Sequence, residues 1–134
     1  MNLAFATLWV ALGGAIGSVA RFWLTEASAK WWGAAFPWGT IIANVTGSFL
    51  IGLIAALPVM GPRDLTGPMG RQFLMVGIMG GYTTFSSFSL QTLTMVQNGH
   101  MAKAALNVGG SVVLCLVAVA LGYALGAMIG GAKA

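Results

Sequence analysis

Residues 77–89 read GIMGGYTTFSSFS, and this stretch decides how the chain can fold. Three glycines precede five hydroxyl side chains within seven positions, and both glycine and β-branched threonine are poor helix formers. We therefore expect the helix that contains this stretch to be interrupted around Gly80–Thr84. Inside a membrane, such an interruption is tolerated only where the backbone is buried in protein or lines a cavity. The stretch thus predicts a broken helix beside a polar space.

The composition indicates that lipid surrounds most of the chain. Only 6% of the 134 residues are charged, 58% are hydrophobic, and the mean hydropathy is +0.90. A soluble domain carries about 25% charged residues, whereas apolar runs of about 20 residues are long enough to cross a bilayer. We expect residues 1–134 to form one all-α domain whose four membrane-spanning helices are about Leu3–Thr25, Trp38–Leu57, Gln72–Val96 and Lys103–Ile129.

The basic residues are balanced between the two sides of the membrane. Four spans place Arg63, Arg71 and Lys133 on one side and Arg21, Lys30 and Lys103 on the other. The excess of cytoplasmic Lys and Arg that normally fixes orientation is then absent. Either another feature fixes the orientation, or the chain inserts both ways and opposed copies pair. We favour this dual topology, because a single four-helix bundle fills its core with side chains and leaves little room for a pathway.

Two helices carry polar residues at intervals of four, which places them on one face. These residues are Thr40, Asn44 and Ser48 in the second span, and Asn107, Ser111 and Cys115 in the fourth. An amide inside a membrane helix needs a partner or water. Asn44 is therefore interpreted either as an interhelical hydrogen-bonding residue or as a donor that faces a polar pathway.

Small residues form stripes of a different kind. They are Gly13 and Gly17, which share a face with Arg21, and Gly122, Gly126 and Gly130. Glycines on one face let another helix approach closely. Arg21 either extends to lipid headgroups or caps carbonyls at a helix end with its fork of donors.

The groups that are missing narrow the function. No Asp or Glu lies inside an expected span, we expect no Lys or Arg near a midplane, and His100 stands alone in a loop. A proton relay, a metal-ligand cluster and a nucleophile–base pair are thereby excluded, which argues against an enzyme. The basic residues are too dispersed to indicate nucleic-acid binding. Neutral hydroxyls and amides suit a small anion, since they donate hydrogen bonds in place of its water, and a phenyl ring adds its positive rim.

Residues 80–89 closely resemble the hallmark of the Fluc (CrcB) fluoride channels. The resemblance continues in residues 13–21, GGAIGSVAR, which are similar to that family's glycine-rich first helix ending in arginine, and in residues 37–49, PWGTIIANVTGSF, which resemble its second helix. It covers all four spans. It implies a dual-topology homodimer that exports fluoride passively across the bacterial inner membrane through two separate pathways.

The resemblance also implies roles for particular residues. The pore residues would be Asn44, Phe85 and Phe88, and the polar track would include Thr40 and Ser111. Helical spacing alone is more typical of core packing for the two phenylalanines, and the resemblance overrides that interpretation.

A structural Na⁺ at the dimer interface would be held by the backbone carbonyls of Gly80 and Thr83 from both subunits, and Arg21 would be the family's structural arginine. Gln91 and Asn107 also fall on the implied pathway. Gln91 stands where many members have glutamate, Asn107 where a larger polar residue is expected, and Cys115 where serine is frequent.

The alternative function is a small multidrug exporter, which also has four short helices and dual topology. Cation export coupled to protons needs a carboxylate within the membrane, and none is present in the expected spans. A non-transporting assembly subunit is a third interpretation, but it leaves the broken helix and the polar stripes unexplained.

Overall fold

The structure, a computed structural model, describes residues 3–59 and 65–131. Within these ranges every regular element is helical. The elements are α1 (Leu3–Trp32), α2 (Trp38–Ala56), α3 (Pro68–Arg71), η1 (Gln72–Met79), α4 (Gly80–Tyr82), α5 (Phe85–Gln97) and α6 (Met101–Ile129). With α3 through α5 taken as one, four helices are long and apolar enough to cross a membrane. The predicted all-α fold with four membrane-spanning helices is confirmed.

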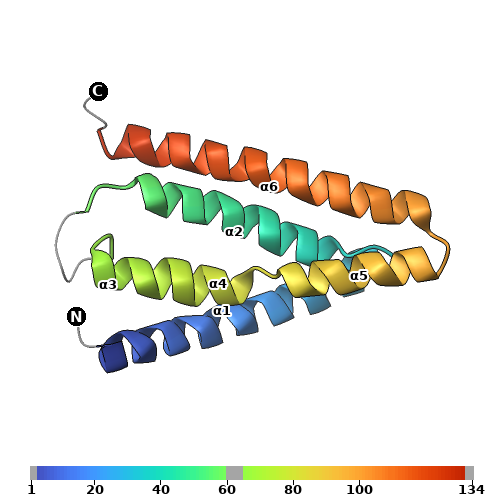
Figure 1. Cartoon of the computed structure of the whole chain (residues 1–134), viewed down its shortest axis with the longest axis horizontal. Helices are drawn as coiled ribbons and strands as arrows, with labels where there is room; N and C mark the ends of the chain where they lie inside the picture. Colours follow the sequence, from blue (N-terminus) through green and yellow to red (C-terminus); the bar gives the residue numbers. More distant parts are fainter. Residues whose placement is uncertain (1–2, 60–64, 132–134) are drawn as a thin grey trace.

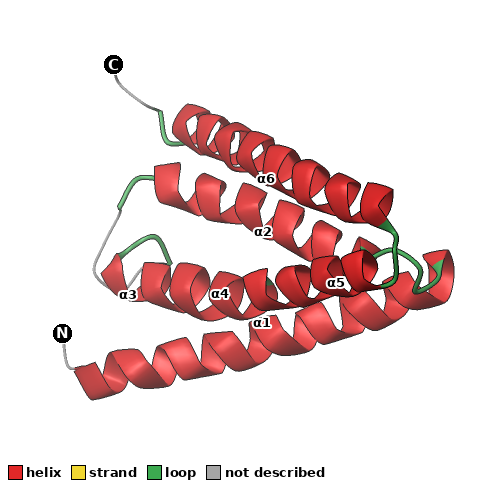
Figure 2. Cartoon of the chain, turned by 45° about the vertical axis from the view of Figure 1, so that its right-hand side comes forward, coloured by secondary structure: helices red, strands yellow, loops and turns green. Residues whose placement is uncertain are grey.

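The helices form a bundle in which α1 begins and α6 ends at the same end (Figure 1). α2 and α6 run side by side in both views (Figures 1 and 2), and α1 packs against η1 and α4. Many large apolar side chains point outward, Leu3 and Met128 among them. Lipid tails are as apolar as leucine, so these side chains lose nothing by facing a bilayer.

Glycines allow the close helix contacts on both sides of the bundle. A Cβ atom at Gly13 would lie 2.6 Å from the carbonyl oxygen of Phe73 in η1. Cβ atoms at Gly17, Gly122 and Gly126 would likewise collide with carbonyl oxygens of the facing helix. The packing role predicted for both glycine stripes is therefore confirmed at these positions.

The first helix extends beyond its predicted end at Thr25. It continues to Trp32 because no glycine or proline intervenes before Gly33, which has a φ of 79°, the left-handed conformation that commonly ends helices. Arg21 therefore lies well before the end of α1, and its Nε donates to the Gly81 carbonyl in the middle of the third membrane helix. The structure therefore corrects the expectation that the first membrane helix ends close to Arg21.

The segment of the third membrane helix that follows α3, η1, is a π-helix, which the sequence did not indicate. Its wider hydrogen-bond spacing is seen where the Gly80 N–H donates to the Met75 carbonyl. π-Helical turns are rare and frequently lie at functional sites. Here η1 packs against the glycine face of α1 and leads directly toward the interruption.

The charged helix ends agree in part with the predicted distribution. Lys30 and Lys103 lie at the end where α1 stops and α6 starts, and Arg71 lies at the opposite end (Figure 1). The Arg71 guanidinium donates to carbonyls at the C-terminal end of α2. Arg63 and Lys133, which the topology prediction also used, lie outside the described residues.

Candidate functional site

The third membrane helix is interrupted at Thr83 and Thr84, inside the range predicted from the sequence. Both residues have extended backbone, with a ψ of 160° at Thr83 and a φ of −156° at Thr84. α5 starts at the next residue, and Thr84 caps it because its Oγ1 accepts a hydrogen bond from the Ser87 N–H at 3.2 Å. Threonine suits this position, since it satisfies an N–H that the first turn of a helix leaves unpaired. The predicted interruption is confirmed.

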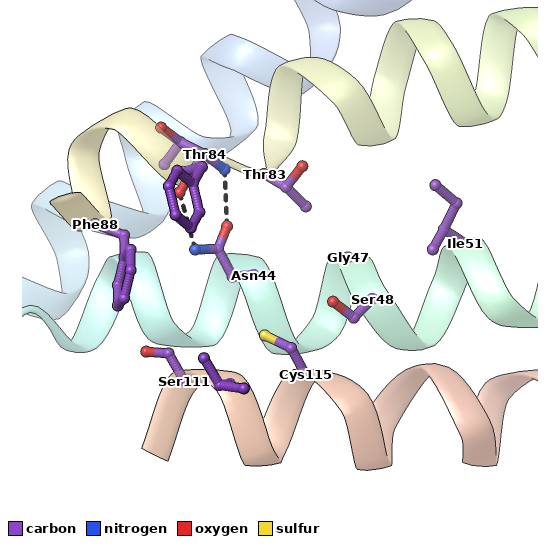
Figure 3. Close-up of a pocket in the computed structure, with 11 residues that line it drawn as sticks. Asn44, Gly47, Ser48, Ile51, Thr83, Thr84, Phe88, Ser111 and Cys115 are labelled. Carbon is purple, nitrogen blue, oxygen red and sulfur yellow. Dashed lines mark hydrogen bonds between the residues drawn. The ribbon is translucent and has the colours of Figure 1, made fainter. Parts of the chain in front are cut away.

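Asn44 on α2 holds this interruption with two hydrogen bonds. Its Nδ2 donates to the Thr84 carbonyl at 3.0 Å, and its Oδ1 accepts from the Thr84 N–H at 2.7 Å (Figure 3). The predicted interhelical hydrogen bond of Asn44 is therefore present. Because a primary amide carries two N–H groups, the second one remains for the cavity that Asn44 also lines.

Two backbone carbonyls lose their helical donors at the interruption. In a continuous helix, the Gly80 carbonyl would accept from the Thr84 N–H and the Thr83 carbonyl from the Ser87 N–H. The first of these N–H groups donates to Asn44 instead, and the second donates to the Thr84 hydroxyl. The Gly80 and Thr83 carbonyl oxygens, which the resemblance implies as cation ligands, therefore do not accept the hydrogen bonds that a continuous helix would give them.

Arg21 approaches the interruption from α1. The 3.1 Å hydrogen bond from its Nε to the Gly81 carbonyl selects the capping interpretation over contact with lipid headgroups. The guanidinium thus lies next to a segment that contains no charged residue.

A cavity of about 330 Å³ lies beside the interruption (Figure 3). Of the predicted pathway residues it brings together Asn44, Phe85, Phe88 and Ser111. Ser48, Thr83, Thr84 and Cys115 add hydroxyl and thiol groups to its wall. None of its lining residues is charged, so the cavity presents neutral donors and aromatic rings.

The two phenylalanines occupy different environments. Their ring centroids lie 5.3 Å apart with an angle of 45° between the planes. Phe88 is packed between helices, with 9% of its surface exposed, whereas Phe85 is 79% exposed although it lines the cavity. The cavity therefore reaches the outer face of the bundle at Phe85, and core packing does not account for this ring.

The remaining predicted pathway residues lie outside this cavity. Thr40 and Gln91 line a second cavity of about 290 Å³ together with Arg21. Asn107 is fully buried: its Nδ2 donates to Thr92 Oγ1 at 2.9 Å, and its Oδ1 accepts from Ser111 Oγ at 3.5 Å. The structure thus places Asn107 in the packing between α5 and α6 rather than on a cavity wall.

Sequence reasoning did not assign Thr84 a role of its own. Its side chain caps α5 and its backbone binds Asn44, so it connects the interruption to two helices. The signal was available: a threonine directly before a run of helical spacing is a typical N-cap.

These features define a small four-helix membrane protein with a discontinuous helix beside an uncharged cavity whose mostly apolar wall carries a few hydrogen-bonding groups. Discontinuous membrane helices are found where ions or small solutes cross membranes. Residues 8–123 match the family described as CrcB-like protein, Camphor Resistance (CrcB). The chain belongs to this family.

Curated relatives agree with the family match. The chain is 55% identical over 116 residues to a protein of Opitutus terrae, which covers 87% of this chain and 88% of that one. It is 48% identical over 126 residues to a protein of Methylocella silvestris, with 94% and 96% covered. A protein of Rhodospirillum rubrum is 53% identical over 116 residues, with 87% and 90% covered. Each of the three is named "Fluoride-specific ion channel FluC".

Proposed function

We propose that this chain is a fluoride channel that lets the ion leave the cell passively. The names of its relatives support this function, and so does membership of the family. The observation that carries the proposal is the wall of the cavity beside the interruption, where the Asn44 amide, the Ser111 hydroxyl and the Phe85 and Phe88 rings meet. This is the wall of a channel rather than an enzyme active site.

The chemistry of this wall suits a small, strongly hydrated anion. Hydroxyl and amide N–H groups replace water as hydrogen-bond donors, and the ring edges offer the positive side of the aromatic quadrupole. Each contact is modest, which conduction requires because the ion must leave as readily as it binds. A carboxylate in the wall would repel the ion, and none lines the cavity. A proton-coupled multidrug exporter is not favoured, because it needs a carboxylate in its pathway and none among the described residues lines this cavity.

The proposed channel is an antiparallel homodimer in the inner membrane of a bacterium. Phe85 lines the cavity while most of its surface is exposed, so in a single copy the pathway would open toward lipid. A second copy laid over this face would close it. The nearly balanced basic residues at the two ends support opposed insertion of the copies.

We further propose that Na⁺ binds where the two copies meet. The Gly80 and Thr83 carbonyls are released from their helical donors by Asn44 and Thr84, and carbonyls of unwound membrane helices are ligands of the kind that coordinate Na⁺. Two carbonyls from each copy would supply four oxygens. The ion would neutralise the partial negative charge of these carbonyls and join the copies. Replacing Na⁺ by K⁺ during purification should then lower the melting temperature of the dimer, and an unchanged melting temperature would contradict the site.

The function is tested by fluoride efflux from liposomes that contain the purified protein, measured with a fluoride electrode. Valinomycin and potassium balance the charge that leaves. We expect rapid fluoride efflux and essentially no chloride efflux from parallel vesicles. Equal efflux of the two anions, or none of either, would reject the assignment.

A further inference from the structure

One face of α5, together with its two cap residues, carries a polar stripe that leads away from the interruption. Its members are Thr84, Ser87, Gln91, Thr94 and Asn98. They recur at alternating intervals of three and four, which puts them on the same side of a helix. Polar side chains inside a membrane need hydrogen-bond partners or water, so a line of five raises the question of whether a polar space lies along it.

Three cavities border this stripe, one after another along α5. Thr84 lines the cavity beside the interruption, and its hydroxyl donates to Ser87 Oγ at 3.1 Å. Ser87 and Gln91 line the second cavity. Gln91 also lines a third cavity of about 430 Å³, together with Thr94 and Asn98. Gln91 is therefore the wall shared by the second and third cavities, and its Oε1 is buried without a hydrogen-bond partner in the described structure.

The third cavity lies at the end of the bundle and carries positive charge. Lys103 and His100 line it where α6 begins. Lys103 is exposed, and no ion pair or hydrogen bond of its side chain occurs among the described residues. A lysine in the first turn of a helix opposes the helix dipole, so helix stability does not explain it. Arg21 and Glu26 both line the second cavity, so its formal charges cancel, whereas Lys103 lines the third cavity and no carboxylate of the described residues does.

From this geometry we infer that the third cavity is the mouth through which a small inorganic anion enters, and that Lys103 concentrates the anion there. The inference rests on the proposed channel function and adds the entry route. The anion passes from Lys103 along Asn98 and Thr94 to Gln91, and from there past Ser87 to the interruption. Lys103 does not bind the ion tightly; its field raises the local anion concentration, an effect that salt screens.

The test compares initial fluoride efflux of Lys103→Gln, Lys103→Arg and Lys30→Gln channels in liposomes at low fluoride concentration. Lys30 is an exposed lysine at the same end of the bundle that does not line the cavity. Its replacement removes the same charge from the topology balance and thus serves as the matched control. All measurements share one pH, so that the charge of His100 is constant, and size-exclusion elution verifies that each variant folds.

Ionic strength is set with impermeant sodium glutamate to about 10 mM or about 300 mM. We expect Lys103→Gln to lower efflux about threefold or more at low ionic strength and to approach the wild-type rate at high ionic strength, within the range known for electrostatic steering. Lys103→Arg and Lys30→Gln should remain at the wild-type rate under both conditions.

Two outcomes would contradict the proposal that the third cavity is the entrance. One is equal efflux of Lys103→Gln and Lys30→Gln at low ionic strength. The other is a loss in Lys103→Gln that does not change with salt, since that indicates a structural defect. Failure of the channel function itself is recognised separately, because wild-type protein would then pass no fluoride at either ionic strength.

Discussion

Asn44 and Thr84 exchange two hydrogen bonds across the space between α2 and the interrupted third helix, through the side-chain amide of one and the backbone of the other. The pair has two effects. It satisfies an N–H and a carbonyl that the interruption leaves without helical partners, and it frees the Gly80 carbonyl from the Thr84 N–H. The same residue also lines the cavity, and its amide carries a second N–H beyond the one that bonds Thr84.

Asn44→Asp tests this double role. A carboxylate still accepts from the Thr84 N–H but faces the Thr84 carbonyl with a second acceptor, which costs about 1–3 kcal/mol for the unsatisfied pair. It also places negative charge on the cavity wall. We expect fluoride efflux to fall about tenfold or more. Gln97→Glu adds the same charge at an exposed position on α5. At high ionic strength, where its field at the neighbouring third cavity is screened, it should leave efflux unchanged; equal losses in both variants under that condition would argue against a specific role of Asn44.

Phe85→Ile and Phe88→Ile separate pore chemistry from packing. Apolar swaps of similar volume usually cost under about 1.5 kcal/mol, so both variants should fold. Isoleucine lacks the aromatic quadrupole, and we therefore expect each variant to lose most of its fluoride efflux while its size-exclusion elution stays that of wild type. Phe5→Ile, on the exposed surface of α1, is the control. A folded Phe88→Ile protein with wild-type efflux would assign that ring to packing.

Gly47→Ala probes how closely α2 approaches the interruption. A Cβ atom at Gly47 would collide with Thr83 Cγ2, and Thr83 cannot easily turn because its Oγ1 donates to the Met79 carbonyl at 2.9 Å. Overpacking of this kind costs about 1–3 kcal/mol. We expect a lower melting temperature in detergent together with reduced efflux.

Gly109→Ala is the matched control for this change. No atom lies within 4 Å of the position that its Cβ would take, and alanine favours a helix interior by about 0.5–1 kcal/mol. Its melting temperature should therefore equal or exceed that of wild type. If the two alanine variants behave alike, the contact between Gly47 and Thr83 is not what matters.

The sequence was sufficient for features that depend on composition or on local chemistry. Apolar runs predicted the four membrane helices, and the glycine and threonine content of residues 77–89 predicted the interruption. Asn44 could be narrowed to two roles, because a buried amide must find a partner. The structure shows the interhelical hydrogen bonds and places Asn44 on a cavity wall, and its role in a pathway stays a prediction.

Asn107 illustrates what the sequence could not provide. Its spacing correctly places it on the same helix face as Ser111, but periodicity does not say which neighbouring helix that face meets at each depth. The partner that satisfies Asn107 is Thr92 on α5, and α5 diverges from the rest of the third helix only because of the interruption. Arg21 was misplaced for a similar reason, since the helix end depends on Gly33 rather than on the apolar run.

Dual topology is the prediction that the charge distribution makes most directly, and the structure supplies reporter positions for it. Ala29 and Val59 are exposed at opposite ends of the bundle. Introduced singly as cysteines in a Cys115→Ser background, each should be labelled in part by a membrane-impermeant maleimide from outside intact cells. The numbers of basic residues at the two ends differ little, so two lysines added after Ala134 should force one orientation and abolish efflux. A second copy with the opposite charge bias should restore efflux if the two copies must oppose each other. Labelling of only one of the two reporters, with full efflux retained, would show instead that every copy inserts in the same direction.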